Sequence, residues 1–207
     1  MRLHPIGILF GALIIVSCSP KLPTAEQLDL ASHHRVIAVL PAEIHIESMR
    51  GTTAEERLKA EQEGMWRYQK EMQVWLFKRK EQGRLNVVLA PTDETNAILK
   101  KAGHFDEKAL TPAEICELLQ VDAIVTSQYT LRQPMSTGLA IALGVLFNIW
   151  TATNQSFAVM DIHDRKTGQV VWRYQRAASG SAGSSLPQLV NGLMRNASRK
   201  LPYRGAR

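Results

Sequence analysis

The run RVIAVLP at residues 35–41 is the strongest signal of fold class in this chain. Its five central residues are all apolar, and a proline ends the run. A strand that is buried on both faces gives such an uninterrupted pattern, whereas a strand with one solvated face alternates between apolar and polar residues. The run therefore predicts the first core strand of a sheet that helices cover.

A long helix is predicted after this strand. Thr53 and Glu56 form a capping box at its start, and Gly83 provides the stop. Such a helix is roughly 43 Å long, which is more than a small sheet covers. Trp66 and Trp75 on this helix are therefore candidate partner contacts. Their apolar spacing favours the alternative, which is burial in the core.

Caps, proline stops and turn signals predict the remaining elements. The expected order is β-α-β-α-α-β-β-β-α, a mixed five-stranded sheet layered with helices, in the α/β (α+β sandwich) class. Residues 35–203 form a single predicted domain, and residues 204–207 form a tail. The elements after the long helix are strands over 85–91, 121–131, 154–163 and 169–175, and helices over 92–102, 111–120 and 186–200.

The second half of the chain carries the most distinctive pattern. Residues 121–125 (VDAIV) lead from a helix into a strand, and residues 159–172 (VMDIHDRKTGQVVW) form a hairpin. The most distinctive positions of this hairpin are Asp161, Thr167, Gly168 and Trp172. With the strand that ends at Pro41, the layout resembles the periplasmic lipoprotein superfamily that includes CsgG, LpoB and the amino-terminal domain of TolB, and is similar to small conserved Gram-negative lipoproteins of unknown function. The resemblance covers most of residues 35–203, and its shared positions are structural.

An apolar run near the start of the chain ends in Ile15-Val16-Ser17-Cys18, behind the basic residue Arg2. The run is well under the roughly 20 residues that a spanning helix needs. The layout is typical of a bacterial lipoprotein signal, so we expect residues 1–17 to be removed. In such a signal the diacylglyceryl group goes onto the Cys18 thiol before the cut, and an acyl chain is expected on the amino group that the cut exposes. Residues 18–34 are expected to form a polar tether. The alternative is an ordinary secretory signal or an uncleaved anchor in which Cys18 is incidental.

Charge and cysteine content limit the classes of partner. The formal net charge of the chain is +6, and removal of residues 1–17 takes away one basic residue, Arg2, which leaves +5. Because this excess is modest and scattered, we expect no nucleic-acid surface, whereas an acidic partner such as a lipid headgroup or cell-wall polymer stays open. Cys116 has no disulfide partner once Cys18 is lipidated, and we expect it to be buried. Ser19 in place of aspartate resembles the pattern of lipoproteins sorted to the outer membrane.

An apolar insertion lies between the third and fourth predicted strands, at residues 134–153. Its core at 138–150 is about 20 Å long as a helix, short of the ~30 Å hydrocarbon layer of a membrane. Three interpretations are open: a buried helix or hairpin, a surface for self-association or partner docking, and a membrane-dipping segment. The candidate contact residues here are Leu139, Ile141, Leu143, Leu146, Phe147 and Trp150.

No catalytic or metal-binding motif stands out, since HExxH, GxSxG and CxxC do not occur. Asp161 and His163 share one strand face and Asp164 begins the turn, which predicts a solvated hairpin end. We therefore expect no enzyme, no metal and no cofactor beyond the lipid on Cys18. The predicted function is that of a lipid-anchored accessory or assembly protein that contacts an envelope protein. The alternative is an oligomeric, CsgG-like export or transport protein that uses 138–150 for membrane or subunit contact.

Overall fold

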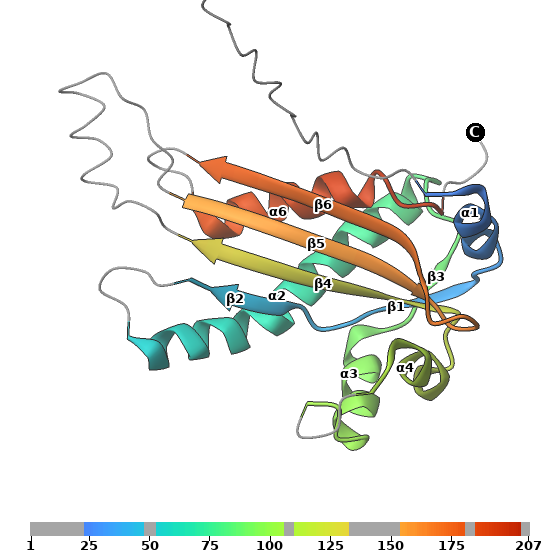
Figure 1. Ribbon diagram of the computed structural model, residues 1–207, viewed down its shortest axis with the longest axis horizontal. Coiled ribbons are helices and arrows are strands. Elements are labelled where there is room, and N and C mark those ends of the chain that lie inside the picture. The colour runs from blue at the N-terminus through green and yellow to red at the C-terminus, as the bar shows by residue number, and fades with distance from the viewer. Residues whose placement is uncertain (1–22, 48–52, 106–109, 133–153, 181–184, 204–207) are drawn as a thin grey trace, which may run out of the picture.

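A mixed sheet organises the part of the chain that the computed structural model describes, which is residues 23–47, 53–105, 110–132, 154–180 and 185–203. The strands are β1 (Val36–Val39), β2 (Glu43–Ile46), β3 (Val88–Leu89), β4 (Ala123–Arg132), β5 (Asn154–Asp164) and β6 (Val170–Gly180). Their order is β3-β1-β4-β5-β6, and β2 pairs with β4 beside this path (Figure 1). β1 is parallel to β3 and β4, and β2 is parallel to β4, whereas β4, β5 and β6 are antiparallel. The expected fold class is confirmed.

The first strand is buried on both faces, as its sequence predicts. Ile37 and Val39 belong to one hydrophobic core, whereas Ala38 and Leu40 belong to the other. This division follows from the alternation of side chains along a strand. The sheet therefore separates two apolar layers, and β1 contributes to both.

Helices cover the two faces unequally. The helices are α1 (Ala25–Ser32), α2 (Ala54–Glu81), α3 (Thr92–Lys101), α4 (Pro112–Leu119) and α6 (Leu186–Ser198). α2 and α6 pack along one face, while α3 and α4 cover one end of the other face (Figure 1). The predicted capping box of Thr53 and Glu56 is present, and Gly83 adopts φ 64° just beyond α2. α2 buries Tyr68 and Leu76 against the larger core.

The expected tether is wrong for residues 25–32, which form α1. The Thr24 hydroxyl accepts a hydrogen bond from the Gln27 backbone N–H, and Gln27 Oε1 accepts one from the Thr24 backbone N–H. A second hydrogen bond, 2.9 Å long, joins Gln27 Nε2 to the carbonyl of Val170 on β6. Because α1 has few apolar residues, its hydrophobic periodicity does not indicate a helix, whereas the capping box of Thr24 and Gln27 does.

The expected number of five strands is also wrong, because six strands are described. β2 follows β1 along the same edge of β4 after the interruption at Pro41. Its sequence, EIHI, offers only two apolar residues and no turn signal. The strand predicted over 85–91 is reduced to β3, which pairs with β1 alone among the described strands.

Several expectations fall outside the described residues: the signal at 1–17, Cys18, the insertion at 134–153 and the tail at 204–207. Within the described part of the chain, no helix is both long enough and apolar enough to cross a membrane.

Candidate binding groove

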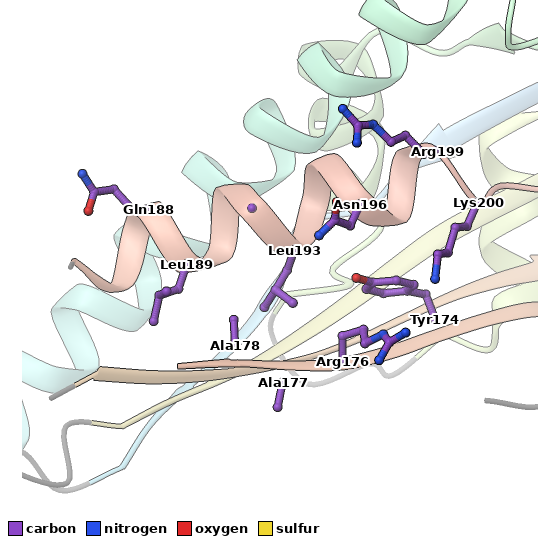
Figure 2. Close-up of a pocket in the computed structure, with 11 residues that line it drawn as sticks. Tyr174, Arg176, Ala177, Ala178, Gln188, Leu189, Leu193, Asn196, Arg199 and Lys200 are labelled. Atoms are coloured by element: carbon purple, nitrogen blue, oxygen red, sulfur yellow. The ribbon is translucent and has the colours of Figure 1, made fainter. Parts of the chain in front are cut away.

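A groove of about 600 Å³ separates α6 from the edge strand β6 (Figure 2). α6 begins with a capping box between Ser185 and Gln188, and its inner face buries Val190 and Met194. Side chains of β6 form the other wall of the groove. The lining residues used below are Tyr174, Arg176, Ala178, Gly192, Arg199 and Lys200. We call this cavity the α6–β6 groove.

The charged side chains of the α6–β6 groove are all cationic. Arg176, Arg199 and Lys200 line it, and no carboxylate does. The sequence explains this bias, because residues 165–207 contain nine basic residues and no acidic one, while the first 164 residues contain 16 basic and 19 acidic residues. The expectation of a scattered basic excess is therefore wrong. The positive charge is concentrated in the segment that builds β6 and α6.

Aromatic side chains hold Lys200 at the groove. The Trp172 indole Nε1 donates a 3.0 Å hydrogen bond to the Lys200 carbonyl. The Lys200 ammonium lies 5.9 Å from the centroid of the Tyr174 ring, and Figure 2 shows the side chain directed toward that ring. Burial raises the pKa of Tyr174, so the phenol is neutral at physiological pH. Lys200 is thus positioned by its backbone and by a cation–π contact, with no carboxylate neutralising it in the described structure.

A buried arginine at the end of α2 extends this positive region. Arg79 is 4% exposed and donates hydrogen bonds to Ser198 Oγ at 3.2 Å and Gln82 Oε1 at 2.7 Å. Burial, followed by the charges of Arg199, Arg84 and Arg195, lowers the pKa of Arg79. No described carboxylate forms an ion pair with Arg79. The repulsion among these arginines favours any anion that approaches them.

A second polar cluster differs from the groove, because its side chains are buried and hydrogen-bonded to one another. His34 Nε2 lies 2.9 Å from Asp164 Oδ1, and His34 Nδ1 lies 2.8 Å from the Tyr203 hydroxyl. In the neutral ring, Nε2 donates to the carboxylate and Nδ1 accepts from the phenol. Asp164 also accepts from the backbone and hydroxyl of Thr167. We call His34, Asp164 and Tyr203 the terminal clamp, because it joins the region before β1, the β5–β6 turn and the end of the described chain.

The sequence pattern predicted a solvated hairpin end, and this prediction is wrong because two of its carboxylates are buried. Asp164 is 3% exposed and Asp161 is 8% exposed. Asp161 accepts two hydrogen bonds from the Arg173 guanidinium, and the one from Nε is 2.7 Å long. Burial lowers the pKa of His163. No group of described residues has the composition of a metal site.

The two candidate tryptophans occupy different environments. Trp66 is 36% exposed and packs edge to face against Phe105, with ring centroids 5.2 Å apart. Trp75 is partly buried against the larger core. It also lines a groove of about 360 Å³ between α2 and Asn191 of α6, where the Lys78 ammonium lies 5.2 Å from its ring. Their role in partner contact stays a prediction.

Other predicted residues are buried or lie outside the described chain. Cys116 is fully buried, and burial raises the pKa of its thiol to about 12, so the residue is a core thiol. The predicted sites that fall outside the described residues are Cys18, Leu139, Ile141, Leu143, Leu146, Phe147 and Trp150. The α6–β6 groove was missed, although the charge bias of residues 165–207 is a sequence signal that could have indicated it.

No protein-family model and no curated protein matches this chain. Solved structures that are similar include a PelC dodecamer from Paraburkholderia phytofirmans, with 11% identity, coverage of 81% of this chain and 89% of that chain, and a TM-score of 0.46. Lipoprotein GNA1162 from Neisseria meningitidis has 13% identity, 79% and 94% coverage, and a TM-score of 0.42. The LpoB C-terminal domain from Escherichia coli has 11% identity, 74% and 95% coverage, and a TM-score of 0.36. TM-scores in this range establish no common fold, so we transfer no function from these proteins.

Proposed function

We propose that this protein is a lipoprotein of the cell envelope, anchored to the outer membrane through Cys18 with its domain facing the periplasm. The observation that carries the proposal is the sequence Ile15-Val16-Ser17-Cys18 at the end of a short apolar run. Two or three acyl chains anchor a protein stably, because each buried CH₂ contributes about 0.8 kcal/mol.

The domain acts by contact with an envelope protein and not by catalysis. Its buried reactive groups have structural roles: the Cys116 thiol is in the core, and His34 is bonded through both ring nitrogens. The α6–β6 groove, in contrast, presents cations at the surface that form no ion pair with any residue that the structure describes. These features support a binding role for the surface and a scaffolding role for the interior.

Lipid attachment is tested by metabolic labelling of the full-length protein with radioactive palmitate. We expect label in the wild type and in Cys116→Ser, and no label in Cys18→Ser, because the other cysteine is buried. Membrane fractionation of the same strains should place the labelled protein in the outer membrane. Label that persists in Cys18→Ser would show that the lipobox interpretation is wrong.

An affinity-tagged full-length protein, cross-linked in cells and purified, tests the contact role. We expect an envelope protein to co-purify from the wild type and to be lost from a variant whose groove cations are reversed, Arg176→Glu with Lys200→Glu. If the same partner still co-purifies with this variant, the partner binds at a surface other than the groove.

An oligomeric export or transport role is the second candidate, and the apolar run at 138–150 is the observation that favours it. Light scattering of the full chain in detergent, with and without residues 136–152, separates the two. A ring-sized particle that becomes a monomer on deletion supports the oligomer. A monomer in both cases removes that candidate.

A further inference from the structure

β6 presents a long free edge beside the α6–β6 groove. The strand is 11 residues long and pairs with β5 alone among the described strands. At one end of this edge, Gln27 Nε2 donates a hydrogen bond to the Val170 carbonyl. Over residues 173–179, no described group pairs with the outward backbone, so an incoming strand has hydrogen-bonding positions available.

Gly192 leaves the α6 wall of the groove open. It lies inside α6, where glycine costs about 1 kcal/mol relative to alanine. A Cβ built at this position meets nothing within 4 Å, and the backbone does not have the positive φ that requires glycine. Neither packing nor backbone conformation therefore explains the glycine. The small side chain of Ala178 lies across the groove (Figure 2), so the gap suits the close approach of another chain.

The positive charges around this edge favour a binding partner that carries negative charge. Arg173 and Arg176 are exposed on β6, and Lys200 and Arg199 are exposed at the end of α6. Arg173 is paired with Asp161, but Arg176 and Lys200 form no ion pair in the described structure. A second copy that paired through its own β6 would bring these same cations together, which disfavours self-association at this edge.

We propose that an extended acidic segment of a partner protein binds here by adding a strand to the outer edge of β6. Its backbone bonds to residues 173–179, and alternate side chains enter the groove, where carboxylates meet Arg176 and Lys200. This inference rests on the proposed contact function and specifies its partner chemistry. A strand partner is favoured over an anionic lipid because a headgroup makes no use of the free backbone edge.

The test is fluorescence polarisation of the full-length protein in non-ionic detergent with a fluorescein-labelled peptide of alternating glutamate and threonine, about eight residues long. We expect saturable binding that is about tenfold weaker in Arg176→Glu with Lys200→Glu. The control variant, Lys59→Glu with Lys101→Glu, makes the same charge change on exposed residues of α2 and α3 and should bind as the wild type does. Gly192→Gln should also weaken binding without lowering the melting temperature, because it fills the groove and removes a helical glycine.

Backbone methylation distinguishes strand addition from simple charge attraction. Two further peptides carry N-methyl groups at alternate residues, on either the odd or the even positions. In strand addition one edge of the peptide faces β6, so one pattern should abolish binding and the other should preserve it. Equal binding by both peptides would contradict strand addition.

Two other results would overturn the proposal. One is a peptide affinity that the groove variants do not change. The other is binding of the wild type to phosphatidylglycerol vesicles that these variants abolish, with no peptide binding, since this would identify a lipid surface. Neither result depends on palmitate labelling, so the anchor proposal stands or fails separately.

Discussion

The terminal clamp and the α6–β6 groove are two polar regions built partly from the same C-terminal segment, yet they are completed differently. In the clamp, His34 and Asp164 are each about 4% exposed or less, and both imidazole nitrogens of His34 have partners at 2.8–2.9 Å. In the groove, Arg176 and Lys200 are exposed and unpaired among the described residues. The comparison teaches that satisfied polar groups hold this fold together, whereas unsatisfied charge marks a surface for something outside it.

The largest expected effect comes from breaking the clamp. His34→Ala leaves the buried Asp164 carboxylate and Tyr203 hydroxyl short of a partner, so we expect a loss of about 3 kcal/mol in the free energy of unfolding. Urea denaturation measures it. The matched control is His33→Ala, because His33 is exposed and makes only local bonds, and its loss should stay within about 0.5 kcal/mol. Equal losses in the two variants would mean that the clamp does not contribute measurably to the free energy of unfolding.

Acid should weaken the clamp next. Burial alone raises the pKa of Asp164, but hydrogen bonds from His34 and Thr167 outweigh it, so the pKa is lowered on folding. The stability that this contributes is present above the unfolded pKa of about 3.9 and is lost as pH falls through the lower folded value. The stability difference between wild type and Asp164→Asn, from urea denaturation at several pH values, should shrink below about pH 4. A difference that does not vary with pH would exclude this linkage.

A pair of glycines contrasts closed packing with the open groove. Gly192→Ala should raise the free energy of unfolding by about 0.5–1 kcal/mol, since its Cβ meets only open space. Gly64→Ala should gain less or lose stability, because its Cβ would lie 3.2 Å from Ile44 Cγ1. Thermal unfolding of both variants tests the contrast. The same gain at both positions would show that the groove is not distinctively open.

The smallest effect concerns salt. Burial lowers the pKa of Arg79 most, and the charges of neighbouring arginines lower it further. Sodium chloride should relieve the part that comes from this repulsion. Going from about 0.02 to 0.2 M salt should raise the melting temperature of the wild type by about 1–2 °C more than that of Arg79→Met. Lys59→Met, near the opposite end of α2 from Arg79, should respond as the wild type does. Identical responses in all three proteins would argue against the repulsion.

Much of the fold follows from local sequence. The capping box of Thr53 and Glu56 and the buried run at 35–41 place α2 and β1 correctly, because each signal involves residues within a turn or a few positions of one another. β2 and α1 were missed for the complementary reason. β2 is defined by its pairing with β4. α1 has little apolar periodicity, although it has a local capping box, and its Gln27 side chain joins it to the Val170 carbonyl of β6.

The candidate site was predictable only in part. The charge bias of residues 165–207 is visible in the chain, but its meaning depends on β6 and α6 facing each other across a cavity. Asp164 shows the same limit: a carboxylate beside a turn is usually solvated, and only the fold brings His34 onto it. The tryptophans Trp66 and Trp75 were identified on the correct helix, but their exposure depends on what packs beside them.

The sequence alone accounts for most of the secondary structure, for the α/β class and for the concentration of positive charge after Asp164, and it supplies the proposed anchor at Cys18. These properties depend on neighbouring residues and on composition. Only the tertiary structure decided that His34 meets Asp164, 130 positions away, and Tyr203, 169 positions away, or that a free edge of β6 borders a cationic groove. Such contacts depend on how distant elements pack, and the packing free energy is a property of the whole core and not of any local pattern.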